Sequence, residues 1–186
     1  DAEYAEHVEN LLSLQERFGA KQEMGAVSEA IRLGAVLASH DDTTAEHVTT
    51  SASNGVGFAE FPTTVEAAKA CRQQGIAVMM GAPNLIRGGS HSGNVAAEDL
   101  AKQDLLDIVS SDYVPSALLL SAFHLARIWD DLPRAIATVT RNPAKAARLE
   151  DRGDLKVGMR GDVLRVRQTE AAPLLRGGWS QGTKNG

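Results

Sequence analysis

The sequence predicts an α/β fold with a parallel sheet, because short apolar segments alternate with helical patterns along most of the chain. The segments are almost continuously apolar, which is typical of parallel strands covered on both faces. Polar and charged residues follow directly after them. Parallel sheets place their active sites at that end of their strands, so we expect a site there.

Composition narrows the class of protein. The chain has 186 residues, of which 43% are hydrophobic and 23% are charged, as expected for a globular core. A single cysteine cannot form an internal disulfide, which indicates a reducing, cytoplasmic compartment. The net charge of -5 argues against nucleic-acid binding, and no apolar stretch approaches the roughly 20 residues needed to span a membrane.

The elements follow in order along the chain. Apolar residues recur at helical spacing up to Gly19, and a second helix is predicted from Gln22 to Leu33. Thr63 and Glu66 have the spacing of a capping box at the start of a further helix. The predicted strands cover residues 35–39, 56–61, 76–82 and 107–111, and helices follow at 65–74 and 115–129.

The remainder of the chain has a different character. A helical segment at 133–149 restarts at Asn142-Pro143, and a hairpin with one wet face is expected at 153–167. One more strand is predicted at 173–179, followed by a loose polar tail. We therefore divide the chain into an α/β domain, 1–150, and a small β domain, 151–186.

The strongest local cluster is His40-Asp41-Asp42, which follows the first strand. A neutral imidazole at a strand end can bind a metal ion, and a neighbouring carboxylate can orient it. The alternative is that Asp42 or Thr43 caps a helix and that His40 is merely exposed.

Two further acids end strands. Asp112 could bind a metal ion and serve as a general base that takes a proton from bound water, or it could cap the next helix. Glu60 lies between apolar neighbours. It could be a buried acid that faces the site, or an edge residue in solvent.

The segment 81–94 is rich in glycine and hydrogen-bond donors. Arg87 supplies a planar cation suited to phosphate, and glycines let backbone N–H groups approach a ligand. Neither a P-loop nor a nucleophile elbow fits the sequence of this segment. The segment is compatible with two interpretations, a phosphate-binding loop and a flexible surface loop. The candidate binding residues are Arg87, Gly88, Gly89, Ser90, His91, Ser92 and Asn94.

Four segments together resemble one family. They are LASHDDTT (37–44), AEFPTT (59–64), GAPNLIRGGSHSGN (81–94) and SSDYVP (110–115). They resemble the PhnM-type amidohydrolases of phosphonate breakdown, the alpha-D-ribose 1-methylphosphonate 5-triphosphate diphosphatases. The likeness runs from about Gly19 to Trp179. NPAKA (142–146) and GMRGDV (158–163) are similar to the ending of the wider amidohydrolase superfamily.

The resemblance implies a (β/α)8 TIM barrel with a divalent metal ion, zinc, manganese or iron, at its carboxyl-terminal mouth. It implies that His40 binds metal from the fifth strand and that Asp112 is the eighth-strand ligand and proton acceptor. Glu60 occupies a place where many members carry another metal-binding histidine. Asp41, Glu60, Arg87 and the glycine-rich stretch would contact the phosphorylated small-molecule substrate.

The resemblance covers only part of such a barrel. The chain lacks the His-x-His segment of the first strand, and a complete barrel takes about 250 residues. It also begins without methionine inside a helical pattern. We therefore expect a fragment: the carboxyl-terminal half of the barrel, strands five to eight, plus returning β-sandwich strands. Alone it should be inactive, and unstable unless a second copy or the missing amino-terminal half completes it.

Two other functions are compatible with these residues. One is an amidohydrolase that cleaves a cyclic amide or deaminates a base, although such substrates rarely need a polyphosphate cradle. The other is a non-catalytic half-barrel that binds phosphate compounds. Measurements of metal binding and of turnover distinguish these two functions from a diphosphatase.

Overall fold

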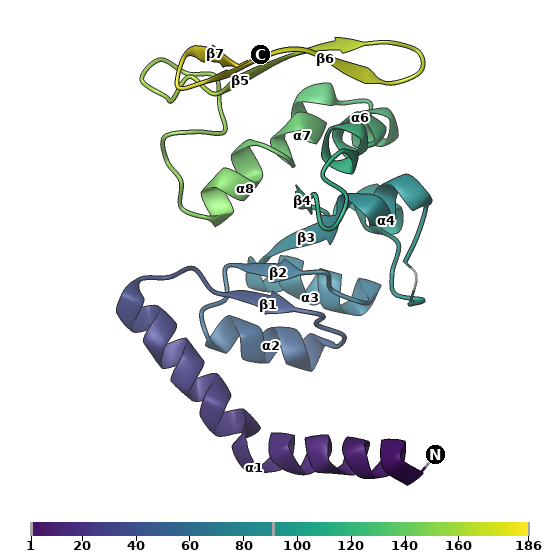
Figure 1. Ribbon diagram of the computed structural model, residues 1–186, viewed down its shortest axis with the longest axis vertical. Helices are drawn as coiled ribbons and strands as arrows, with labels where there is room; N and C mark the ends of the chain where they lie inside the picture. Colours follow the sequence, from purple (N-terminus) through teal and green to yellow (C-terminus); the bar gives the residue numbers. More distant parts are fainter. Residues whose placement is uncertain (1, 91, 186) are drawn as a thin grey trace. The chain divides into compact units, whose positions relative to one another are not determined.

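The computed structural model describes residues 2–90 and 92–185 (Figure 1). Contacts divide the chain into two compact units, Asp1–Leu37 and Ala38–Gly186. The predicted division at residue 150 falls between α8 and β5 of the second unit and stays a prediction.

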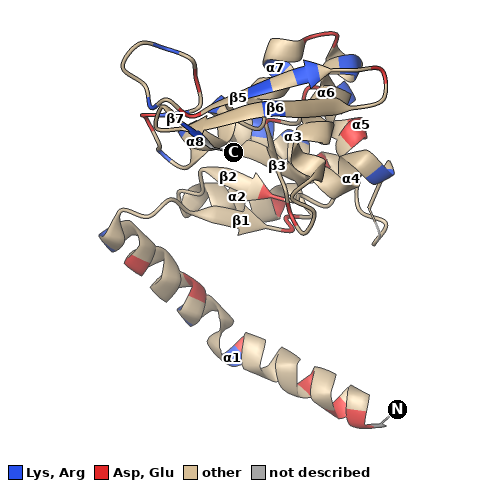
Figure 2. Cartoon of the chain, turned by 45° about the horizontal axis from the view of Figure 1, so that its top comes forward, with Lys and Arg blue, Asp and Glu red and all other residues tan. Residues whose placement is uncertain are grey.

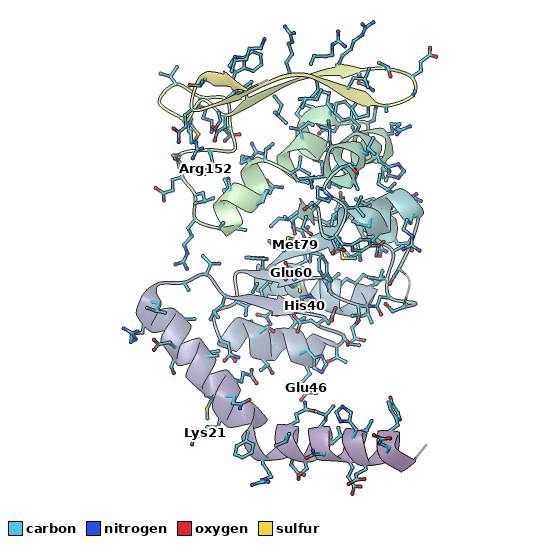
Figure 3. The ribbon with its side chains drawn as sticks, in the orientation of Figure 1. Lys21, His40, Glu46, Glu60, Met79 and Arg152 are labelled. Atoms are coloured by element: carbon cyan, nitrogen blue, oxygen red, sulfur yellow. The ribbon has the colours of Figure 1, made fainter. Side chains whose placement is uncertain are left out.

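The first unit contains one helix, α1 (Ala2–Leu33), so the prediction of two helices divided at Gly19 was wrong. An interior glycine costs a helix only about 1 kcal/mol relative to alanine. The neighbouring Ala20, Lys21 and Gln22 favour helix and carry it past that position. The helix nevertheless changes direction along its length, with Lys21 near the bend (Figures 1 and 3).

The second unit is built on a four-stranded sheet in the order β1-β2-β3-β4, with every neighbouring pair parallel. The predicted parallel α/β architecture is therefore confirmed. The strands are β1 (Ala38–His40), β2 (Phe58–Glu60), β3 (Ala77–Gly81) and β4 (Ile108–Ser110). They are shorter than the apolar segments that predicted them.

Two connecting helices begin in the same way. They are α2 (Ala45–Ser53) and α3 (Val65–Gln74), and the bounds of α3 match the prediction. Thr44 and Thr64 are the N-caps, and each side chain accepts a hydrogen bond from a first-turn backbone N–H. The predicted cap Thr63 was therefore one residue early. Glu66 does not close a capping box there but accepts from the backbone N–H of Ala45 at 3.0 Å.

The core lies on one face of this sheet. Val78, Met80 and Val109 alternate along β3 and β4 and are at most 3% exposed, in one cluster with residues of α3 and α6 (Ala117–Trp129). Side chains at alternate positions of a strand point to opposite faces. His40, Glu60 and Met79, which are paired in register, therefore lie on the other face.

The glycine-rich segment is partly helical. Residues 82–87 form α4 (Ala82–Arg87), with Pro83 in its first turn and Gly88 in a left-handed C-cap, φ 79°. The interpretation of the whole segment as a loop was therefore wrong, because Gly81 and Gly88 bound a short helix. A second short helix, α5 (Ala97–Lys102), leads to β4.

The rest of the chain contains α7 (Leu132–Ala137), α8 (Arg141–Ala146) and an antiparallel sheet. That sheet has the order β5-β6-β7, with β5 (Val163–Gln168), β6 (Pro173–Ser180) and β7 (Thr183–Asn185). The hairpin predicted at 153–167 was wrong, because residues 153–162 form no strand and β5 pairs instead with β6, which matches the predicted strand at 173–179. The expected loose tail pairs as β7. Basic segments mark β5 and β6 in Figure 2.

In the part of the chain that the structure describes, no helix has the length and apolar character needed to cross a membrane.

Candidate functional site

The candidate site lies where β1 to β4 end. His40 pairs in register with Glu60, and Glu60 with Met79, so His40 and Glu60 come together on one face at this edge (Figure 3). Acidic residues mark the ends of β1 and β2 in Figure 2. The four parallel strands therefore bring side chains from distant parts of the sequence to one edge, as predicted.

Three non-glycine residues at this edge adopt left-handed backbone angles. Asp41 has φ 61°, Phe61 has φ 55° and Asp112 has φ 49°. Each follows the end of a strand by one or two residues. Such angles cost free energy for residues with a Cβ and gather at functional sites, where surrounding contacts hold them. All three side chains line the same cavity.

That cavity has a volume of about 200 Å³ and collects most of the predicted site residues. The predicted residues among its lining are Asp41, Arg87, Gly89, Ser90, Ser92, Asn94 and Asp112. His40, Glu60 and Gly88 do not line it. His91 lies outside the described residues.

The carboxylate of Asp112 lies across the end of β3. A Cβ built on Gly81 would stand 2.8 Å from Asp112 Oδ2 and 3.3 Å from its Cβ, both closer than ordinary contact. Only glycine at position 81 leaves this space. β3, which pairs with β4, therefore helps to fix the direction of the Asp112 carboxylate.

Arg87 is paired with an aromatic residue that the sequence analysis missed. Its Nη1 lies 3.4 Å from the hydroxyl of Tyr113 and donates a hydrogen bond to it, and both side chains line the cavity. A guanidinium and a phenol side by side can bind phosphoryl oxygens as donors. Tyr113 follows Asp112 directly, and this adjacency is the signal that could have found it.

His40 is oriented by its neighbour. Its Nδ1 lies 3.0 Å from Asp41 Oδ2, and its ring meets the edge of Phe61 at a centroid distance of 5.3 Å. A carboxylate at Nδ1 favours the tautomer that leaves Nε2 with a lone pair. His40 thus reaches the cavity indirectly, through Asp41 and Phe61, which line it.

Local hydrogen bonds close the loop between α4 and α5. Asn84 Oδ1 accepts from the N–H of Ala97 at 2.9 Å, and the N–H of Ser92 donates to Ser90 Oγ at 3.2 Å. These contacts hold the two serines of the loop over the cavity, beside Asn94.

The donors present do not complete a metal site. Among residues 2–90 and 92–185, no three His, Cys, Asp or Glu side chains gather closely enough to hold an ion. His40 and Asp112 share the edge, but β1 and β4 stand three strand spacings apart, roughly 14 Å. These two residues could each supply a ligand, but the described residues place no group of three such side chains around either of them.

We compared the chain with protein families, with known sequences and with solved structures. No family model matches the chain. The chain is 44% identical to the alpha-D-ribose 1-methylphosphonate 5-triphosphate diphosphatase of Escherichia coli (strain K12) over 192 residues, so the predicted resemblance is confirmed. The match covers 99% of this chain and 50% of the relative, so the chain spans about half the length of the relative.

Solved structures show the fold at lower identity. A prolidase complexed with N-methylphosphonate-L-proline aligns with a TM-score of 0.63 and 15% identity, over 86% of this chain and 47% of that one. An ochratoxinase of A. niger aligns with a TM-score of 0.60 and 16% identity, over 85% and 43%. These neighbours have the amidohydrolase fold, which fits part of a TIM barrel.

Proposed function

We propose that this chain is the carboxyl-terminal half of a diphosphatase that hydrolyses alpha-D-ribose 1-methylphosphonate 5-triphosphate in phosphonate catabolism. The observation that carries the proposal is the cavity at the carboxyl edge of the sheet, whose lining joins an acid, Asp112, to a cation suited to phosphate, Arg87. The 44% identity to such an enzyme supports the choice of substrate. β1 to β4 would be barrel strands five to eight, and β5 to β7 part of the β-sandwich.

In this proposal Asp112 takes a proton from water as the water oxygen attacks the first phosphorus of the triphosphate. The bond from that phosphorus to the oxygen bridging the first two phosphates breaks, and diphosphate leaves with the electron pair. A general base in this position typically accelerates such a step 10²- to 10⁴-fold.

The substrate's negative charge is met by the other side of the cavity. Arg87 and Tyr113 would donate to phosphoryl oxygens, and Ser90, Ser92 and Asn94 would add hydrogen bonds from the loop above. His91, adjacent to these serines, is proposed as a further donor, and Gly88 and Glu60 as residues at the margin of the substrate.

A divalent ion, zinc, manganese or iron, is proposed as cofactor, with His40 and Asp112 among its ligands. When bound, such an ion polarises a phosphoryl oxygen or lowers the pKa of a bound water. The remaining ligands would come from the amino-terminal half, because the described residues do not gather three His, Cys, Asp or Glu side chains around one point. We also propose a cytoplasmic location, and completion of the barrel by that half or by a second copy.

The test is to join this chain to the amino-terminal half of the E. coli relative and assay the purified joined protein. We expect diphosphate release from the ribose triphosphate and none from this chain alone. Cyclic amides and nucleobases serve as competing substrates. A folded, monodisperse joined protein that cleaves an amide but no triphosphate would contradict the proposal, and one that binds phosphate without turnover would favour a non-catalytic module.

A further inference from the structure

We infer that Asp42 is a positioning residue: its buried carboxylate fixes the turn after β1 between β1 and α2, its backbone carbonyl ties that turn to the loop after β2, and the fixed turn holds Asp41 against His40. The consequence for catalysis rests on the proposed function, whereas the consequence for the orientation of His40 does not.

Asp42 differs sharply from the acid beside it. The residue is 7% exposed, whereas the side chain of Asp41 is 58% exposed. Asp42 Oδ2 accepts from the hydroxyl of Ser39 at 2.5 Å, and Ser51 Oγ lies 3.4 Å from Oδ1. A buried carboxylate is costly unless hydrogen-bonded, so these contacts fix it between β1 and α2.

The backbone of Asp42 ties this loop to the next one. Its carbonyl accepts from the N–H of Thr63 at 2.9 Å. Thr63 Oγ1 donates to Thr43 Oγ1 at 2.9 Å, and Thr64 Oγ1 donates to the carbonyl of Thr43 at 2.6 Å. The two loops that carry Asp41 and Phe61 are therefore held as one body.

This anchoring is what a strained turn requires. Asp41 has φ 61°, a conformation that a residue with a Cβ keeps only when its surroundings hold it. Its N–H donates to the carbonyl of Glu60 at 3.0 Å while its carboxylate meets His40 Nδ1. Loss of the Asp42 carboxylate would let the turn relax and would separate Asp41 from His40.

The chain offers a matched control at the other edge of the sheet. Asp107 also adjoins a strand and accepts two hydrogen bonds, from the N–H of Val78 at 2.9 Å and from Arg72 at 3.0 Å. Asp107→Ala should lower stability in a similar way, but far from His40. It therefore separates a general loss of stability from a specific loss of positioning.

The experiment measures the ¹⁵N shifts of the His40 imidazole in the metal-free joined protein at one fixed pH of about 8. We expect one predominant tautomer, with the proton on Nδ1, in the parent protein and in Asp107→Ala. Asp42→Ala should bring the two tautomers toward equal populations. If Asp42→Ala does not fold, Ser39→Ala, which removes the shortest hydrogen bond and keeps the carboxylate, should shift the populations in the same direction.

Unchanged His40 shifts in the folded variants, or an equal change in Asp107→Ala, would overturn the inference. In the joined protein, Asp42→Ala should lower kcat at least tenfold with a smaller change in KM. The kcat of Asp107→Ala, measured below the melting temperature of that variant, should stay within about twofold of the parent value. Altered His40 shifts in a joined protein that hydrolyses no triphosphate would refute the proposed function and leave the positioning role standing.

Discussion

The two edges of the parallel sheet are built on opposite principles. At the carboxyl edge, three non-glycine residues hold left-handed angles around a cavity, and two of them are acids, Asp41 and Asp112, whose carboxylates belong to its lining. The amino edge has a larger cavity, of about 440 Å³, whose lining includes one such residue, Asp104. Its charged side chains neutralise one another.

At the amino edge, the arginine side chains that line the cavity are paired with acidic side chains. Arg134 reaches Asp104 at 2.5 Å and lies 4.0 Å from the ring centroid of Trp129. Arg72 bonds both Asp107 and the carbonyl of Asp104. The larger cavity is therefore part of a structural clamp, and the smaller one is the better candidate for ligand binding. Cavity size alone would favour the amino edge.

Substrate binding at the carboxyl edge should depend strongly on Arg87. Arg87→Ala removes the cation of the cavity, so KM of the joined protein should rise about 100-fold, in line with the 2–3 kcal/mol of a charged hydrogen-bond partner. Arg87→Lys should recover part of this, because lysine keeps the charge without the planar fork. An unchanged KM in Arg87→Ala would remove the residue from the binding site.

Gly81→Ala tests the geometry of the acid without removing it. The new Cβ would stand 2.8 Å from Asp112 Oδ2, so the carboxylate must move. We expect kcat of the joined protein to fall about tenfold, since misplacement by about 1 Å costs up to 10² in rate. Gly25→Ala, where nothing lies within 4 Å of the added methyl, is the control. Equal rates for the two variants would contradict the account.

Arg134→Ala tests the clamp. The variant loses an exposed ion pair and a cation–π contact, so the free energy of unfolding should fall by about 1 kcal/mol. Triphosphate binding should not change, because this side chain lies at the amino edge. Denaturant titration and isothermal calorimetry measure the two quantities. Weaker triphosphate binding would break the comparison between the edges.

Ser110→Ala should have a smaller effect on stability. Ser110 Oγ is buried at the end of β4 and has no hydrogen-bond partner among the described residues. Removing it should change the free energy of unfolding by less than about 0.5 kcal/mol, or stabilise the fold. Ser121→Ala, which deletes a buried hydroxyl that donates to the carbonyl of Leu118 at 2.8 Å, should cost more. Thermal melts of the two variants decide this, and a larger loss in Ser110→Ala contradicts it.

The buried thiol of Cys71 should make stability depend on pH. Burial raises the pKa of the Cys71 thiol from 9.0 to about 11. The unfolded chain therefore loses its thiol proton first, so the stability contributed by Cys71 is full below pH 9 and lost as the pH rises toward 11. Cys71→Ser should flatten this loss in denaturant titrations at pH 8 to 11. An identical slope in both proteins would contradict the assignment.

The sequence predicted those parts of the fold that have a strong periodic signal. The bounds of α3 and the parallel pairing of β1 to β4 agree with the predictions, because capping residues and apolar strands are local features. α4 was missed because six residues between glycines carry too little pattern, and α1 was divided because Gly19 is a common helix end. The bounds of both helices depend on whether neighbouring residues favour helix strongly enough to outweigh the glycines, and residue types alone do not decide this.

The candidate site was predictable to a similar degree. Asp41, Arg87 and Asp112 were found because strand ends meet at one edge. Tyr113 and Gly81 were missed, since an exposed aromatic and a single glycine have no distinctive spacing and gain meaning only from Arg87 and Asp112 beside them. The role of Asp42 depends on contacts with Ser39 and Thr63 that only the folded chain reveals.

The most direct test of the central claim, that the carboxyl-edge cavity is the hydrolytic site, is Asp112→Asn in the joined protein. We expect diphosphate release to fall at least 10³-fold while the ribose triphosphate binds within about threefold of the parent affinity, because the amide keeps the shape and cannot accept the proton. Turnover at the parent rate in a folded Asp112→Asn protein would contradict the account.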